Sequence, residues 1–75
     1  MTKPTPIEDV PIGGDMIRLG QFLKFAGALD SGGEVKEAIA DGDVSVNGRV
    51  EIRRGRQLHP GDVVSFAGRR FRALA

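Results

Sequence analysis

Residues that could bind a polyanion are concentrated late in this 75-residue chain. From residue 49 to the end there are seven arginines and only two acidic residues, which gives that stretch a net charge of +5. The first 48 residues have a net charge of −4, so the overall charge of +1 conceals a strong polarity. A basic surface attracts a polyanion while the acidic part repels it, and nucleic acid is therefore the leading candidate partner.

The seven arginines of residues 49–75 fall into two groups, one in the middle of the chain and one near its end: Arg49, Arg53, Arg54 and Arg56, then Arg69, Arg70 and Arg72. As exposed loop charges, Arg53, Arg54 and Arg56 are expected to contribute little to stability and much to binding. Solvated arginines are also common on strands, so charge alone leaves simple solvation open as an alternative.

Residues for catalysis or metal binding are sparse. His59 is the single histidine, and no cysteine or second histidine could complete a metal site or a nucleophile–base pair. We therefore expect no catalytic residues, no metal ligands and no cofactor. The four phenylalanines offer little for base stacking, because only Phe25 is predicted to be exposed, and the sequence favours recognition of nucleic-acid shape and phosphates.

The length and composition indicate one small domain, which we place at residues 7–75 behind a disordered tail at residues 1–6. The absence of cysteine fits a reducing compartment, and no apolar run approaches the roughly 20 residues that span a bilayer. The N-terminus lacks the basic and apolar regions of a signal peptide. We expect a soluble cytoplasmic monomer that does not contact membranes.

Two helices are predicted in the first half, after a short edge strand at Ile7–Ile12. The first has an N-cap at Asp15 and an end at Gly27, and its buried stripe comprises Leu19, Phe22, Leu23 and Ala26. Arg18 and Lys24 lie off that stripe. The second begins with Ser31 and Glu34 at the capping-box spacing, ends at Gly42, and has a buried stripe of Val35, Ala38 and Ile39.

One side of the second predicted helix, formed by Gly33, Lys36 and Ala40, is small and free of acidic residues by helical geometry. With the exposed amides of the first turn, this side could accommodate a phosphate backbone. The alternative is that Gly32 and Gly33 only shape the turn and that Lys36 is solvated.

From Val44 the apolar residues alternate, which predicts strands. Asn47–Gly48 favours a tight hairpin, but a two-residue loop would place Val44 and Val46 on the face opposite Val50, so we expect a bulge or a looser turn there. Pro60–Gly61 suits a type II turn, and Ala67–Gly68 reverses the chain again. The predicted fold class is α+β, with two short helices packed on a small, mostly antiparallel sheet.

Several motifs occur together in residues 18–66: the RL opening at Arg18, the turn and helix from Ser31, GDVSVNG at residues 42–48 and PGDVV at residues 60–64. This segment resembles the S-four RNA-binding domain, also called the alpha-L motif. The small size, the SGGEVK sequence at residues 31–36 and the SFAG sequence at residues 65–68 are most similar to the stand-alone YbcJ-like bacterial subfamily. The resemblance implies the alpha-L fold.

The resemblance also implies that the chain binds structured RNA, ribosomal or tRNA-like, and that the ribosome is a candidate partner. With Lys24 added from the helix pattern, the candidate RNA-binding residues are Arg18, Lys24, Ser31, Gly33, Lys36, Asn47, Arg49, Arg53, Arg54 and Arg56. One position departs from the family, because many members have an arginine where this chain has Gly32.

Alternatives stay open at several of these positions. Arg18 could instead form a surface ion pair with Asp15, and Asn47 and Gly48 are primarily turn formers. A different functional class is a protein-interaction adaptor whose arginines dock an acidic protein surface.

Overall fold

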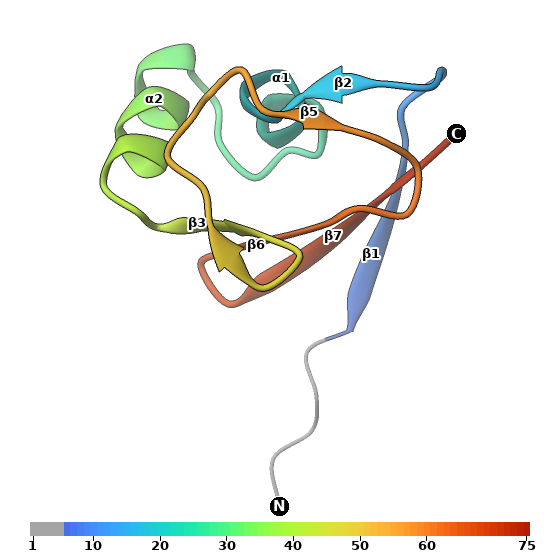
Figure 1. Cartoon of the computed structure of the whole chain (residues 1–75). Coiled ribbons are helices and arrows are strands. Elements are labelled where there is room, and N and C mark those ends of the chain that lie inside the picture. The colour runs from blue at the N-terminus through green and yellow to red at the C-terminus, as the bar shows by residue number, and fades with distance from the viewer. Residues whose placement is uncertain (1–5) are drawn as a thin grey trace, which may run out of the picture.

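The computed structural model describes residues 6–75, so the tail expected at residues 1–6 lies, apart from Pro6, outside the described residues. The elements in chain order are β1 (Ile7–Pro11), β2 (Ile17–Arg18), α1 (Leu19–Phe25), α2 (Gly32–Ala40), β3 (Val44–Val46), β4 (Arg49–Val50), β5 (Gln57–Leu58), β6 (Val63–Phe66) and β7 (Arg69–Leu74). Both helices cover one face of a five-stranded sheet (Figure 1). The prediction of an α+β fold with two short helices is confirmed.

The five strands are ordered β1-β7-β6-β3-β4, and β2 pairs with β5 in a separate two-stranded sheet. Only the β1–β7 pairing is parallel. The edge strand predicted near Ile7 is confirmed as β1, which lies at one border of the larger sheet. Within residues 6–75, no helix is long and apolar enough to cross a bilayer.

The first helix begins later than the sequence predicts. Asp15 is not its N-cap, because residues 17 and 18 are extended and pair with β5, and the cap position is Arg18. Arg18 makes no side-chain cap hydrogen bond. The amides of Leu19 and Gly20 instead donate to the carbonyls of Arg56 and Arg54, at 2.8 and 3.0 Å. A distant loop therefore satisfies the first turn, a contact that local capping signals could not reveal.

The second helix follows its sequence signals closely. The Ser31 hydroxyl accepts a hydrogen bond from the Glu34 amide at 3.2 Å, as a capping residue should. Gly42 follows the C-cap with a φ of 80°, and Gly27 has a φ of 75° after α1, so both predicted helix ends are confirmed.

The β3–β4 hairpin has a strict two-residue turn, and the expected bulge is wrong. Asn47 and Gly48 have φ values of 52° and 85°, and Val46 pairs with Arg49 across the turn. This register turns Val50 and Ile52 away from the core, where they are 63% and 65% exposed. It also places the acidic Glu51 at an inward position beside Val44, whose carbonyl accepts from the Glu51 amide.

The core lies between the helices and the sheet. Phe22 and Phe71 are fully buried and meet edge to face at 6.5 Å between ring centroids. Residues from β1, α1, α2, β3, β5, β6 and β7 complete the core. Phe25 is 63% exposed, as the helical pattern predicts, so its ring is excluded from this cluster.

Candidate nucleic-acid interface

The segment from Glu51 to Arg56, which we call the arginine loop, is held against the start of α1. It runs from β4 to β5, and in Figure 1 it rises from the sheet toward the start of α1. Its carbonyls accept from the first two amides of α1, as described above. In addition, Nη1 of Arg18 donates to the Gly55 carbonyl at 2.9 Å. Arg18 therefore contacts the loop and does not form an ion pair with Asp15.

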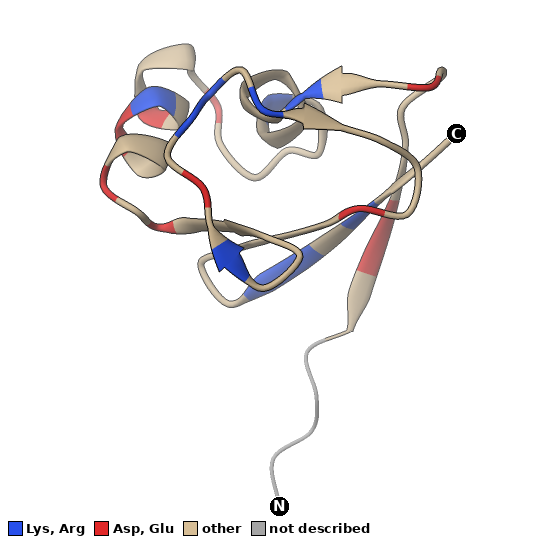
Figure 2. Ribbon diagram, viewed as in Figure 1, with Lys and Arg blue, Asp and Glu red and all other residues tan. Residues whose placement is uncertain are grey.

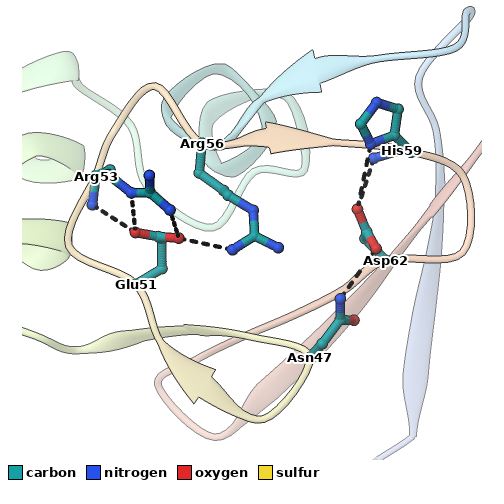
Figure 3. A network of polar contacts seen from close by, with 6 residues as sticks. All are labelled: Asn47, Glu51, Arg53, Arg56, His59 and Asp62. Atoms are coloured by element: carbon teal, nitrogen blue, oxygen red, sulfur yellow. Dashed lines mark hydrogen bonds and ion pairs between the residues drawn. The ribbon is translucent and has the colours of Figure 1, made fainter.

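Glu51 organises the arginine loop from within (Figure 3). Its side chain is almost fully buried, and Oε2 accepts from both the backbone amide and Nε of Arg53, each at 3.1 Å. Oε1 accepts from Nη1 of Arg56 at 2.8 Å. Arg53 and Arg56 are thus partners of a buried carboxylate. Arg53 is exposed, as expected of a loop charge, but the sequence did not predict that Glu51 pairs with both arginines.

The ionisation of Glu51 reflects this pairing. Hydrogen bonds from Arg53 and then Arg56 lower its pKa to about 2 from the usual 4.5, although burial acts in the opposite direction. A carboxyl whose pKa is depressed by folding contributes stability above its unfolded pKa, and that stability is lost as the pH falls toward its folded pKa. Glu51 therefore contributes stability that is complete above about pH 4.5 and disappears toward pH 2.

We expect Glu51→Gln to lower the free energy of unfolding at neutral pH. Near pH 2 the free energies of unfolding of the variant and the parent protein should become equal. Other acids titrate in both proteins, so the difference between the two isolates Glu51. Chemical denaturation followed by circular dichroism at a series of pH values measures it. A difference in the free energy of unfolding between the two proteins that does not change with pH would contradict the assigned role of the carboxylate.

A basic groove of about 420 Å³ lies between α1, the start of α2 and the arginine loop. Its lining comprises Arg18, Gly20, Gln21, Lys24, Gly32, Val35, Arg54 and Gly55. Three of these residues carry positive charge, and no acidic residue lines the groove. The groove thus offers a concave surface suited to an anion, and its cations come from β2, from α1 and from the arginine loop.

The aliphatic stem of Arg54 lies against the backbone of α1. A Cβ atom added to Gly20 would lie 2.6 Å from Cγ of Arg54, so only glycine leaves room for this close approach. The stem is therefore placed by packing, while the guanidinium makes no ion pair with an acidic residue in the part of the chain that the structure describes. Packing of its stem on Gly20 therefore holds Arg54 in the lining of the groove, where its guanidinium is available to an anion.

The candidate residues on α2 lie outside this groove. Gly33 and Lys36 line a separate shallow hollow with Ala40 and three acids, Glu34, Glu37 and Asp41. The expectation of an acid-free side is therefore wrong, because the carboxylates border the same surface. Gly32, which the sequence places in an exposed first turn suited to an anion but not among the candidate RNA-binding residues, lines the groove together with Val35.

Ser31 and Asn47 are engaged in internal structure. The Ser31 hydroxyl caps α2. The Asn47 side-chain amide donates a hydrogen bond to Asp62 at 3.1 Å (Figure 3), and its oxygen accepts one from the Val63 amide at 2.9 Å. Asn47 therefore joins the hairpin turn to the turn at Pro60–Gly61, where Gly61 has a φ of 100°. Arg49 is exposed on β4 and is not among the groove residues.

The C-terminal arginines have acidic neighbours from the opposite end of the sequence. Arg69 pairs with Glu8 at 2.9 Å and Arg72 with Asp9 at 2.8 Å, both across the β1–β7 pairing. Figure 2 shows these basic and acidic segments on adjacent strands. The charge polarity along the sequence is thus partly cancelled in the fold, and the groove retains a cluster of cations without acidic lining.

Comparison with known proteins places this geometry in a family. The S4 domain matches residues 10–73, which is most of the chain. The chain belongs to the S4 domain family. The alpha-L fold expected from the sequence is confirmed by the solution structure of YbcJ from Escherichia coli, which is described as an alpha-L motif involved in RNA binding. That structure matches with a TM-score of 0.71 and 33% identity, covering 100% of this chain and 96% of the other.

Further proteins resemble this chain in sequence or in fold. "Probable ribosome maturation protein RlbA" of Bacillus subtilis is 46% identical over 59 residues, which cover 79% of this chain and 83% of that protein. The YbcJ sequence of Escherichia coli is 41% identical over 59 residues, covering 79% of this chain and 84% of YbcJ. The 30S ribosomal protein S4e of Thermoplasma acidophilum shares the fold, with a TM-score of 0.61 and 21% identity over 79% of this chain and 31% of that one.

The list of candidate residues predicted from the sequence omits several that line the groove or hold its loop: Gly20, Gln21, Gly32, Glu51 and Gly55. Gly20 could have been recognised from the sequence, because glycine weakens a helix and its presence inside an amphipathic helical pattern suggests that close packing requires it. No comparable signal marks Glu51, whose neighbours become clear only from the register of the hairpin. Within residues 6–75, no group of three or more His, Cys, Asp or Glu side chains could hold a metal ion.

Proposed function

We propose that this protein binds structured RNA, ribosomal RNA or ribosome-associated RNA, without catalysing a reaction on it. The observation that carries the proposal is the basic groove, where Arg18, Lys24 and Arg54 line one concave surface without an acidic neighbour. Membership of the S4 domain family and the similarity to RlbA and YbcJ support the same partner. The protein acts as a cytoplasmic monomer in this proposal.

The groove would receive the sugar–phosphate backbone, because its cations surround a surface on which glycines expose the main chain. Gly32 and Gly55 are exposed in its lining, so a phosphate can approach the backbone closely there. In this proposal Lys36, one helical turn after Gly32, contacts the RNA where it continues over α2, beyond the groove. Arg49, on β4, provides a further cation beside the arginine loop, where Arg53 and Arg56 keep the loop in place.

Ser31, Gly33 and Asn47 receive supporting roles in this proposal. Ser31 and Asn47 fix the start of α2 and the hairpin through the hydrogen bonds already described. Gly33 is exposed next to Gly32 and has open space around it, so RNA bound in the groove can pass over it without obstruction.

A salt titration tests the proposal. The affinity for a folded ribosomal RNA fragment should fall linearly on a log–log plot, with a slope of roughly 0.7 to 0.9 per phosphate contacted, the range for single-stranded and duplex DNA. Contacts from the three groove cations predict a total slope of at least about 2. Fluorescence anisotropy at several salt concentrations measures it, and affinity that is independent of salt would refute binding through phosphates.

The alternative of a protein-interaction adaptor rests on one observation. Val50 and Ile52 are exposed apolar side chains next to the arginine loop, and such residues can anchor a protein partner. An apolar anchor would make binding insensitive to salt, so the same titration separates the two functions.

A further inference from the structure

Phe25 is an unusual side chain for the surface of so small a domain. It is the last residue of α1 and is 63% exposed, whereas Phe22, one turn earlier, is completely buried. Within residues 6–75, the aromatic and cation–π contacts involve Phe22, Phe71 and Arg69 but not Phe25. Its ring therefore presents an accessible aromatic surface at the end of α1.

The position of Phe25 relates it directly to the basic groove. The hollow beside its ring is lined by Ile17, Gln21, Lys24 and Phe25. Gln21 and Lys24 also line the basic groove, so the two depressions share a border along α1. Residues 21, 24 and 25 have the i, i+3, i+4 spacing of one helix face, which aligns the cation and the ring. A strand whose phosphate contacts Lys24 thus has an aromatic surface next to it.

Nucleotide chemistry matches this combination. A phosphate needs a cation, and the base of the same or the adjacent nucleotide has an apolar face that stacks on aromatic rings. Ile17 supplies a further apolar surface beside the ring. A base within a duplex is already stacked on its neighbours, so only an unpaired base can reach a protein ring in this way.

We propose that Phe25 stacks on one unpaired base of the RNA whose backbone occupies the basic groove. This inference rests on the proposed function and specifies its substrate class, which is a helical RNA interrupted by an unpaired nucleotide. The sequence favoured recognition of shape and phosphates alone because the chain has few aromatic residues. One ring is sufficient here, since the groove cations already hold the strand beside it.

The chain offers a direct optical test because it contains no tryptophan and no tyrosine. Phe25→Trp introduces a single emitter at the stacking position and keeps an aromatic face. The probes are two RNA duplexes that differ only by one bulged adenosine. We expect the bulged duplex to quench the tryptophan emission and to bind at least about fivefold more tightly than the paired duplex, for the parent protein and for Phe25→Trp.

Phe25→Leu is the matched control, since it keeps an apolar side chain of similar size without the ring. It should bind both duplexes with the affinity that the parent has for the paired one, and its salt dependence should match the parent's because the cations are intact. Thermal unfolding should confirm that it stays folded. Equal affinity of the parent for the two duplexes, or a preference for the bulge retained in Phe25→Leu, would overturn stacking but leave phosphate binding standing. Failure of the parent to bind either duplex would overturn the proposed function as well.

Discussion

Replacing Lys24 and Arg54 together by glutamine should weaken RNA binding by about a hundredfold at physiological salt. Both side chains line the basic groove from opposite sides, one on α1 and the other on the arginine loop. A hydrogen bond that involves a charged group contributes roughly 1.5 kcal/mol or more, so the loss of two such contacts accounts for the factor. The slope of the salt dependence should also decrease by about 2. Anisotropy titrations at several salt concentrations measure both quantities.

The fold should tolerate this double substitution. Both residues are exposed, and within the described part of the chain neither forms an ion pair with an acidic residue. Exposed substitutions usually change stability by under about 0.5 kcal/mol each. Arg53 and Arg56 are unsuitable for the same experiment, because their removal would leave the buried carboxylate of Glu51 without partners.

The matched control is Arg69→Gln combined with Arg72→Gln, which lowers the net charge by the same amount. Those arginines pair with Glu8 and Asp9 on exposed strands, and such surface pairs contribute little to stability. We expect the control to weaken binding only slightly, through long-range attraction. If the two double variants lost equal affinity, net charge would explain the binding and the groove would not be the site.

The local elements of this fold could be predicted from sequence because short-range chemistry determines them. Ser31 and Glu34 encode the start of α2, and Gly27 and Gly42 encode the two helix ends through their left-handed conformations. The Asn47–Gly48 turn follows from the same rule. The prediction of a bulge is wrong because the apolar alternation that includes Val50 suggests burial of that residue, whereas the register of the hairpin leaves it exposed.

The start of α1 depends on partners that are distant in sequence. Asp15 is a reasonable cap by local rules, but the carbonyls of Arg54 and Arg56 satisfy the first amides of the helix and allow it to begin at Leu19. The same long-range docking brings Arg54 next to Lys24 and forms the groove. Sequence identified these cations individually, and only the tertiary structure shows which of them share a surface.

Burial of charge could not be predicted either. Glu51 lies in a basic segment, and no local signal in the sequence marks it as buried. The two-residue turn nevertheless points its side chain inward, where it pairs with Arg53 and Arg56. For this reason the sequence predicts only a binding role for Arg53 and Arg56, although both also hold the loop in place. In the fold, one acid determines which arginines position the loop and leaves Arg54 for the groove.

The second large effect should come from Gly20→Val, a substitution that alters no charge. A Cβ atom at Gly20 would lie 2.6 Å from Cγ and 3.1 Å from Cδ of Arg54, and the branched side chain of valine would extend farther into the loop. Overpacking costs roughly 1 to 3 kcal/mol, and displacement of the loop would also break the backbone hydrogen bonds from Leu19 and Gly20. We expect a stability loss of about 2 to 4 kcal/mol, measured by urea denaturation.

The same substitution should weaken RNA binding by at least about tenfold under conditions where the protein remains folded, because Arg54 would move out of the groove. Gly33→Val is the matched control for stability, since Gly33 is also the second residue of its helix but has open space where the side chain would lie. The change in helix propensity is the same at both positions, so the difference in their stabilities isolates the contact with the arginine loop. A Gly20→Val protein with parental stability and parental RNA affinity would show that α1 and the loop are not packed together as the groove requires.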